Sequence, residues 1–212
     1  TALTLEQPVS RRVEEVPLSN ALGRVLAEDV YAQTDLPPFN KSPFDGYAYR
    51  TADIPGTLHV VGVHTVGVQR LTELHPGEAV QIFTGAPMPE RADAVVKQED
   101  ITRTGDEITI TMPAKPGTNV ILCGEDVRRG TLLLPGGTRL LPAHLGELAG
   151  QGIANVRVWR SPKAVLLPTG SELAEPGEVC RSYGIYNSSS IVLTSYLSRM
   201  GIDVRRGAII PD

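Results

Sequence analysis

The stretch LPPFNKSPFDGYAYR, residues 36–50, marks a change in the character of the chain. Its adjacent prolines, Pro37 and Pro38, lack the backbone N–H that strand pairing requires, so a crossing between domains is predicted here. From Tyr47 onward, short β-prone runs alternate with turns that contain glycine and proline. We therefore expect a β-rich module over residues 36–126, folded as a small barrel or sandwich.

Strands within this module are predicted from clusters of β-branched and apolar residues. They lie at residues 59–63, 79–83, 93–96 and 108–111, and the sequence Thr104-Gly105-Asp106-Glu107 is typical of a hairpin turn. Glycine (21 residues) and proline (17 residues) are frequent, whereas aromatic residues make up only 5% of the chain. This composition favours many short strands with few long helices.

The segments on either side of the module, residues 16–35 and 127–160, are expected to form a linker module. In the first, Ser19 is a suitable N-cap for a short helix over residues 19–27, and residues 28–32 are compatible with an extended segment.

In the second segment, residues 131–134 and 138–141 flank Pro-Gly-Gly and predict a strand, a turn and a second strand. A helix is expected over residues 142–149, with its proline in the first turn. A further short helix is expected at residues 4–9.

The C-terminal part of the sequence has the pattern of a βαβ unit. Residues 163–167 are almost continuously apolar, as in a parallel strand that is buried on both faces. Residues 188–200 carry apolar side chains at helical spacing, and residues 204–210 form a second β-prone run. One βαβ unit is not a domain, so residues 161–212, with residues 1–15, are expected to begin a larger, truncated three-layer α/β domain.

Composition and charge narrow the class of protein. The net charge of −4 argues against a nucleic-acid-binding surface, and no apolar run approaches the length of about 20 residues that spans a bilayer. The chain opens without a signal-like segment. Its two cysteines, Cys123 and Cys180, lie far apart and do not form a metal-binding pair. We therefore expect a cytoplasmic protein, and its charge is compatible with an anionic small ligand.

The first candidate functional groups lie within the β-rich module. Asp45 stands between an aromatic residue and a glycine, as a metal ligand, a general base or an ordinary surface turn would. Thr84 and Gly85 follow a predicted strand in a turn that could hold an anion or serve only as a tight turn. Glu125 and Asp126 are adjacent carboxylates that belong either to a shared site or to a solvated corner.

Further candidates lie in the βαβ unit. Thr169, Gly170 and Glu172 follow the first strand, at the edge where open α/β sheets bind ligands, in a predicted strand-to-helix turn. Ser188 opens the expected helix, where N–H groups and hydroxyls can bind an anion or merely cap the helix. Asp212 ends the second strand at the same edge as Thr169.

These motifs, in this order, resemble the molybdopterin molybdenumtransferase family, which includes MoeA and the gephyrin E domain. The resemblance extends over nearly the whole chain and corresponds to the N-terminal portion of that family. It rests on LGRVLA (22–27), LPPFNKSPFDGYAYR (36–50), IFTGAPMPERADAVVKQED (82–100), NVILCGEDVRRGTLLLPGGTRLLPAHLGELAGQGI (119–153) and LLPTGSELAEPGE (166–178).

The resemblance implies an enzyme that inserts molybdate into adenylylated molybdopterin, releases AMP and uses Mg²⁺. It also implies a homodimer, a molybdopterin-binding role for the α/β domain, a dimerisation role for the linker module and a possible molybdopterin adenylyltransferase partner. Carried over by motif, the catalytic candidates are Asp45, Asp126 and Glu172, and the metal candidates are Asp45, Glu172 and Asp212. The substrate-binding candidates are Thr84, Gly85, Thr169, Gly170 and Ser188.

Two positions depart from the family pattern, which usually has Asp at the positions of Ser171 and Asn187. The basic residues expected to bind molybdate are also absent from the sequence, so this chain alone is not expected to complete the reaction. An alternative reading is a non-catalytic relative that binds molybdopterin or serves as a scaffold, with this chain acting as a dimerisation module.

Overall fold

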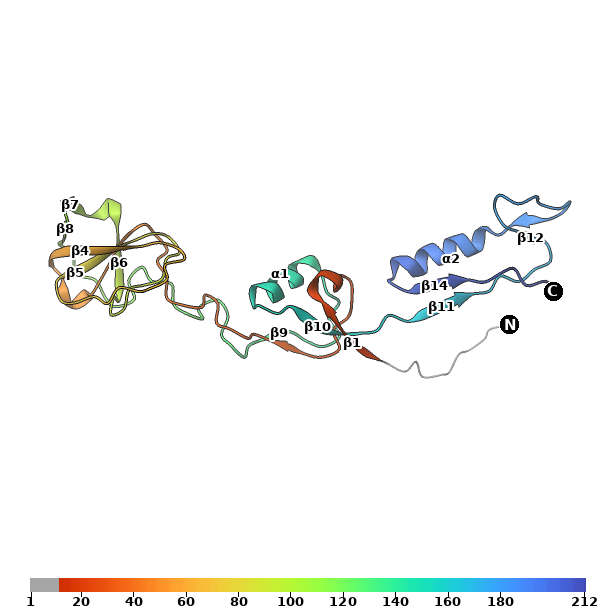
Figure 1. Ribbon diagram of the computed structural model, residues 1–212, viewed down its shortest axis with the longest axis horizontal. Helices are drawn as coiled ribbons and strands as arrows, with labels where there is room; N and C mark the ends of the chain where they lie inside the picture. Colours follow the sequence, from red (N-terminus) through yellow and green to blue (C-terminus); the bar gives the residue numbers. More distant parts are fainter. Residues whose placement is uncertain (1–11) are drawn as a thin grey trace. The chain divides into compact units, whose positions relative to one another are not determined.

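The computed structural model of the protein describes residues 12–212, so the helix expected at residues 4–9 lies outside the described part. The chain divides into two compact units: Tyr31–Leu132, and the residues up to Val30 together with Leu133–Asp212. Residues 12–212 form mostly short strands and only two α-helices, as the composition predicts (Figure 1). Neither helix is long and apolar enough to cross a membrane.

The unit Tyr31–Leu132 is built on one six-stranded mixed sheet with the strand order β6-β3-β5-β4-β8-β7. The β4–β5 pair is parallel and the other pairs are antiparallel. The predicted strands and the hairpin turn between β7 and β8 are confirmed, whereas closure into a barrel or sandwich stays a prediction. The strands are β3 (Gly46–Tyr49), β4 (Gly56–His64), β5 (Glu78–Ile82), β6 (Ala94–Lys97), β7 (Thr102–Thr104) and β8 (Glu107–Ile110).

Strand β3 is buried along its whole length, because both faces of the sheet are covered there. Successive side chains of a strand point to opposite faces. Tyr47 and Tyr49 accordingly belong to one hydrophobic cluster, with Leu58 and Ile108, while Ala48 belongs to a second cluster on the other face. This double burial fixes the strand that directly follows Asp45.

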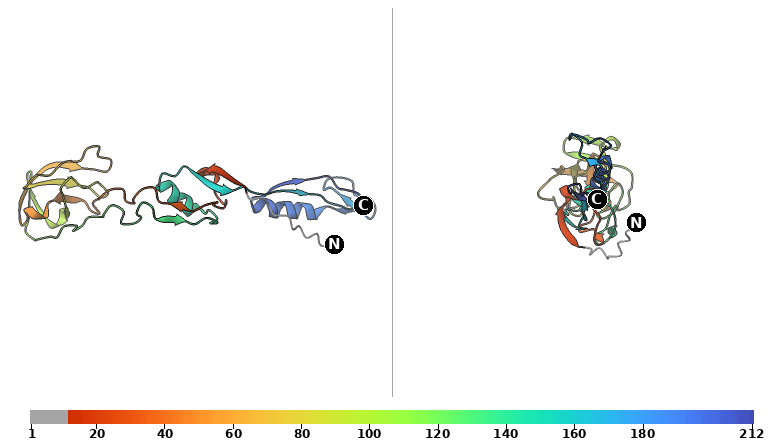
Figure 2. Two further views of the ribbon diagram at one scale, coloured as in Figure 1. Left: turned by 90° about the horizontal axis from the view of Figure 1, so that it is seen from below. Right: turned by 90° about the vertical axis from the view of Figure 1, so that its right-hand side faces the viewer.

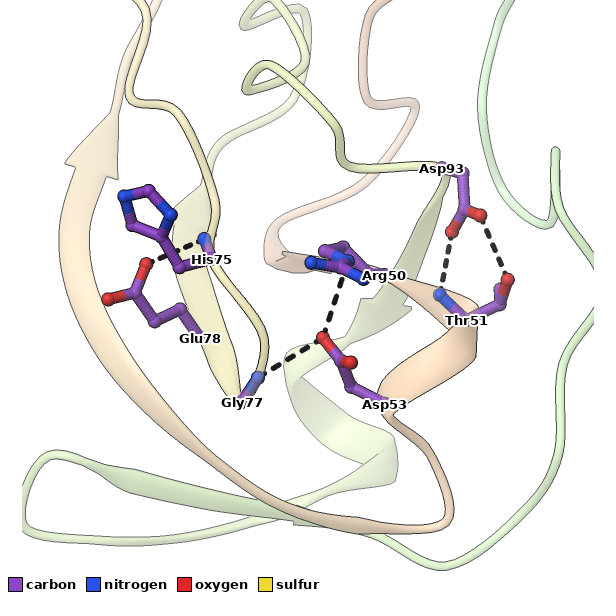
Figure 3. Close-up of polar contacts among 7 residues, drawn as sticks. All are labelled: Arg50, Thr51, Asp53, His75, Gly77, Glu78 and Asp93. Atoms are coloured by element: carbon purple, nitrogen blue, oxygen red, sulfur yellow. Dashed lines mark hydrogen bonds and ion pairs between the residues drawn. The ribbon is translucent and has the colours of Figure 1, made fainter.

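Polar contacts brace the end of β3 and the short 3₁₀ helix η2 (Thr51–Asp53) that follows it (Figure 3). Asp93 accepts hydrogen bonds from the Thr51 N–H at 2.7 Å and from the Thr51 hydroxyl at 2.9 Å. Asp53 accepts a hydrogen bond from the Gly77 N–H at 3.2 Å and pairs with the Arg50 guanidinium at 3.5 Å. These contacts tie the chain after β3 to the segments before β5 and β6.

Replacing Asp93 by Ala is expected to lower the free energy of unfolding by about 2 kcal/mol, since hydrogen bonds to a charged group contribute about 1.5–3 kcal/mol. Urea unfolding followed by circular dichroism measures the change. Asp106→Ala removes a carboxylate that is 73% exposed and should cost less than about 0.5 kcal/mol. Equal stability of Asp93→Ala and the unsubstituted protein would show that the brace contributes little.

The other unit has a hydrophobic core of its own. Strand β1 (Val13–Pro17) pairs antiparallel with β10 (Asn155–Trp159), and a two-stranded sheet joins β2 (Val30–Tyr31) to β9 (Leu132–Leu134). The predicted helix after Leu141 is confirmed as α1 (Pro142–Gly150). The fully buried members of this core are Ala21, Leu26, Leu140, Leu148 and Val158.

The helix predicted over residues 19–27 is wrong. Only the 3₁₀ helix η1 (Leu18–Asn20) forms, and Gly23 then adopts a left-handed conformation with φ +75° that ends helical geometry. Leu26 instead donates its N–H to the carbonyl of Thr138 at 2.9 Å. Burial of Leu26 in the core outweighs the weak helix propensity of this segment.

Of the strand, turn and second strand predicted over residues 131–141, the first strand and the turn form, but residues 138–141 form no strand. The first strand, β9, pairs with β2 rather than with the residues after the turn. The residues after the turn bond to the segment around Leu26, with the Leu140 N–H donating to the carbonyl of Arg24 at 2.8 Å. Both halves therefore find partners more than a hundred positions away, which local turn signals do not predict.

The predicted βαβ connection is confirmed: β11 (Lys163–Leu166) and β14 (Asp203–Arg206) are parallel, and α2 (Ser188–Arg199) comes between them in sequence. The helix lies alongside β14 in both views (Figure 1, Figure 2). Burial of β11 on both faces is wrong for the described residues, because Val165 is 65% exposed and β11 has β14 as its one sheet partner.

The segment after β11 also differs from expectation. Residues 169–172 were predicted as a strand-to-helix turn, but they lead into the short strand β12 (Leu173–Ala174). This strand pairs in parallel with β13 (Ile185–Tyr186), and α2 begins only after β13. An additional loop, residues 175–184, therefore separates the end of β11 from the helix.

Candidate functional site

Asp45 stands directly before β3, at a point where two strands approach very closely. Gly46 pairs with Lys97 of β6 on one side and with Ile82 of β5 on the other. A Cβ atom at Gly46 would lie 2.0 Å from the carbonyl oxygen of Val96, so no side chain fits there. Asp45 is therefore the last residue before a segment of backbone that has little freedom to move.

The turn after β5 is bonded to the segment that carries Asp45. It spans Phe83 to Ala86, with the Ala86 N–H donating to the Phe83 carbonyl at 2.9 Å and Gly85 at φ +81°, as in a type II turn. The Gly85 N–H donates to the carbonyl of Ser42 at 2.8 Å, and the Ser42 N–H donates to that of Ala86 at 3.1 Å. The turn and residues 42–45 thus form one hydrogen-bonded assembly.

Thr84, the exposed residue of this turn, holds the carboxylate of Asp45. Its backbone N–H and its hydroxyl both donate to Asp45 Oδ1, each at 2.7 Å. The N–H bond, and after it the hydroxyl bond, keep the pKa of Asp45 below its ordinary value of 3.8. Within the described residues, Asp45 Oδ2 accepts no hydrogen bond and is free to meet a ligand. A carboxylate with a lowered pKa is a weak base, so the geometry favours binding a cation or orienting water over abstracting a proton.

The carboxyl carbon of Asp45 is expected to titrate with a midpoint below 3.8 in ¹³C NMR, because both Thr84 bonds stabilise its ionised form. The folded-state pKa is lowered, so this contribution to stability is present above the ordinary pKa and is lost as the pH falls through the folded-state pKa. In Thr84→Val the hydroxyl bond is absent, and the midpoint should move up towards 3.8. An unchanged midpoint in that variant would contradict the role of the hydroxyl.

An open hollow of about 450 Å³ lies beside Asp45 and Thr84. Phe44 and Lys97 also line it, with residues 98–100. The ammonium group of Lys97 lies 4.3 Å from the centre of the Phe44 ring, a cation–π contact in the hollow that Asp45 also lines. Motif analysis did not single out Lys97, whose signal is its position at the end of β6, opposite Gly46.

Asp126 does not line this hollow. It lies in an exposed loop, where its backbone N–H donates to the carbonyl of Leu36 at 2.9 Å. Side chains from the preceding crossing hold this loop: Asn40 Oδ1 accepts from the Cys123 N–H at 2.8 Å, and Asp35 Oδ1 accepts from the Arg129 N–H at 2.7 Å. The structure therefore places Asp45 and Thr84 together and leaves Asp126 outside their contacts.

The candidate residues that follow β11 lie near one another and near the C-terminal residues 210–212. Thr169 forms a parallel bridge with Ile210, and the backbone N–H of Asp212 donates to the hydroxyl of Ser171 at 3.1 Å. Gly170 has φ +142°, and a Cβ atom there would lie 2.6 Å from a carboxylate oxygen of Glu172. The glycine thus leaves room for the Glu172 carboxylate to lie against the backbone of Gly170.

Asn187 has a structural role that explains its departure from the family pattern. It is only 3% exposed, and its Oδ1 accepts from the Ser190 N–H at 3.2 Å as the N-cap of α2. Its Nδ2 donates to Glu175 at 3.0 Å, a bond that the carboxylate of an Asp could not donate. A hydrogen bond from Arg206, and after it this amide bond, lower the pKa of Glu175. Ser188 is the exposed first residue of the helix.

The two groups of candidates do not by themselves form a metal centre. Among residues 12–212, no three Asp, Glu, His or Cys side chains converge on a point where they could hold an ion. Asp45 and Glu172 belong to different compact units. A Mg²⁺ ion would consequently need ligands beyond those that either unit brings together in one chain.

Comparison of the chain with known proteins identifies its family. Residues 1–152 match the model described as the MoeA N-terminal region, domains I and II. The chain belongs to the MoeA family. A molybdopterin molybdenumtransferase from Haemophilus influenzae is 36% identical over 222 residues, which cover 99% of this chain and 55% of the relative. One from Staphylococcus aureus strain N315 is 34% identical over 89% of this chain and 47% of the relative.

A solved structure confirms the fold. The crystal structure of a molybdopterin biosynthesis MoeA protein from Pyrococcus horikoshii has a TM-score of 0.89 and 36% sequence identity, covering 95% of this chain and 53% of that one. A second structure of that protein gives a TM-score of 0.83. The chain thus spans about half the length of the MoeA proteins it matches, which correspond to it through their N-terminal region.

Proposed function

We propose that the protein acts in molybdenum cofactor biosynthesis, inserting molybdate into adenylylated molybdopterin with release of AMP. The observation that carries the proposal is the Asp45 carboxylate, which two Thr84 hydrogen bonds hold in its ionised form beside an open hollow. Membership of the MoeA family supports the choice of substrate, since the relatives are named molybdopterin molybdenumtransferases.

In this proposal, the free oxygen of Asp45 orients a cation or a water molecule at the reacting phosphate. Thr84 and Gly85 position that carboxylate and present backbone to the substrate. Thr169, Gly170, Glu172 and Ser188 serve a second part of the same substrate, and Asp126 remains a catalytic candidate from a separate loop.

Magnesium and a homodimer belong to the proposal as well. Asp45, Glu172 and Asp212 are its candidate Mg²⁺ ligands. We assign no step to the ion, because the described residues of one chain bring no complete ligand set together. We also propose that the protein is cytoplasmic and that it contacts the adenylyltransferase that makes its substrate. Sedimentation of the protein tests the dimer, and a monomer at high concentration would contradict it.

The test uses the protein in its full native length, supplied with adenylylated molybdopterin and Mg²⁺. Chromatography of the nucleotides should show AMP release that depends on added molybdate. AMP release that ignores molybdate would indicate a simple hydrolase. Tight binding of the substrate without any AMP release would support the alternative, a scaffold.

The scaffold alternative was suggested by the departures from the family pattern at Ser171 and Asn187, and the structure gives the second of these another explanation. Asn187 caps α2 and donates to Glu175, so its amide is accounted for by packing rather than by loss of a catalytic carboxylate. Ser171 uses its hydroxyl to accept the Asp212 N–H, a bond that an Asp could also accept. The residues that depart from the family pattern are thus compatible with an active enzyme.

A further inference from the structure

A second hollow, of about 600 Å³, lies beside Gly170, Ser171 and Glu172. Residues of the loop between β12 and β13 also line it, among them Arg181 and Tyr183. Motif analysis assigned no function to this loop. Its side chains nevertheless share a hollow with the candidate substrate-binding residues.

The loop is packed against the Glu172 segment rather than extending freely. The Ile185 N–H donates to the carbonyl of Glu172 at 2.9 Å. A Cβ atom at Gly184 would lie 2.9 Å from Cys180 Sγ and 3.0 Å from the Glu172 carbonyl oxygen. The close approach that Gly184 permits therefore holds the loop in place beside Glu172.

Arg181 has no structural partner that explains its position. Glu172 and Glu178 bring carboxylates to the hollow, and Arg181 is the one cationic residue that lines it in the described part of the chain. Its guanidinium makes no ion pair or hydrogen bond with residues 12–212. By contrast, Arg206 of the same unit pairs with Glu175. A guanidinium without a protein partner in a hollow is available to a ligand.

The neighbouring Tyr183 has an unusual backbone conformation, which Arg91 and Asn119 share elsewhere in the protein. It has φ +65°, a conformation that a bulky side chain rarely adopts, and its ring is fully exposed. No burial of the ring compensates for this conformation. Backbone strain of this kind, where it is observed, is concentrated at ligand-binding segments.

We infer that Arg181 binds the pyrophosphate group of the adenylylated substrate in this hollow. The inference rests on the proposed function, from which the pyrophosphate is taken. A guanidinium presents parallel N–H donors that match two phosphate oxygens. The carboxylates of Glu172 and Glu178 would repel a phosphate, and the positive charge of Arg181 offsets that repulsion. Tyr183, on the same loop, also lines the hollow.

The test compares Arg181→Ala, Arg181→Lys and Arg199→Ala in the full-length protein. Arg199 ends α2, does not line the hollow and changes the net charge by the same amount. Calorimetry with inorganic pyrophosphate should show affinity about tenfold weaker or more in Arg181→Ala, and a smaller loss in Arg181→Lys. Binding by Arg199→Ala should be unchanged. The KM for adenylylated molybdopterin should rise in parallel with little change in kcat.

Pyrophosphate binding that is unaffected in Arg181→Ala would overturn the inference, as would an equal loss in Arg199→Ala, which would indicate non-specific attraction. A loss of kcat without a change in binding would also count against it. Calorimetry needs no turnover, so it tests the site separately from the reaction. If the protein bound pyrophosphate through Arg181 but released no AMP, the proposed reaction would be contradicted and the binding site would be supported.

Discussion

Replacing Asp45 by Asn should lower molybdate-dependent AMP release by at least about 100-fold, the range seen when a positioned ionised group is removed from a reacting centre. The amide oxygen of Asn can still accept both hydrogen bonds from Thr84, so the turn after β5 should keep its geometry. What disappears is the negative charge of Asp45, while Glu99 and Asp100 still line the hollow. Steady-state turnover at saturating substrate measures the effect.

The matched control is Asp106→Asn, which removes a carboxylate from the exposed turn between β7 and β8 in the same unit. It should retain the turnover of the unsubstituted protein. The thermal midpoints of both variants should be close to that of the parent. Comparable turnover in Asp45→Asn and Asp106→Asn would remove Asp45 from the reaction, whatever its contacts.

Gly46→Ala is expected to destabilise the β-rich unit by at least about 3 kcal/mol, at or beyond the upper end of the usual cost of overpacking. The added methyl group would lie 2.0 Å from the carbonyl oxygen of Val96, on the neighbouring strand β6. This atom belongs to the backbone and cannot rotate away, so β3 and β6 must separate. Urea unfolding monitored by tyrosine fluorescence measures the loss, since Tyr47 and Tyr49 are buried in this strand.

Gly62→Ala provides the control, on strand β4 of the same sheet. A Cβ atom at Gly62 would be 3.6 Å from the Thr72 hydroxyl, which is an ordinary contact. Its stability should stay within about 1 kcal/mol of the parent. If both glycine variants were equally stable, the close approach of β3 to β6 would not constrain the protein.

Local patterns predicted those elements whose stabilising contacts are close in sequence. Alternating apolar residues and the Gly105 turn were enough to predict β8 and the hairpin turn that precedes it. The apolar spacing of residues 188–200 likewise predicted α2. The helix prediction for the segment around Leu26 was wrong, because the segment bonds to Thr138 and Leu140. No local signal identifies contacts at that separation in sequence.

The candidate site divides in the same way. The resemblance selected Asp45 and Thr84 by motif, and the structure places them in direct contact through two hydrogen bonds. The sequence did not predict the structural role of Asn187, because that role depends on a hydrogen bond from its amide to Glu175, twelve residues away. Arg181 lies in no motif that the sequence analysis identified. It became a candidate because it lines a hollow that forms only when the loop folds.

The central claim is that Thr84 acts through Asp45, as one hydrogen-bonded unit at the reacting centre. A double-mutant cycle in AMP release tests it most directly, using Asp45→Asn, Thr84→Val and the two changes combined. If the claim is right, Thr84→Val alone slows the reaction, and the double variant is no slower than Asp45→Asn. A double variant whose deficit equals the product of the two single deficits would contradict the claim, because the two residues would then act independently.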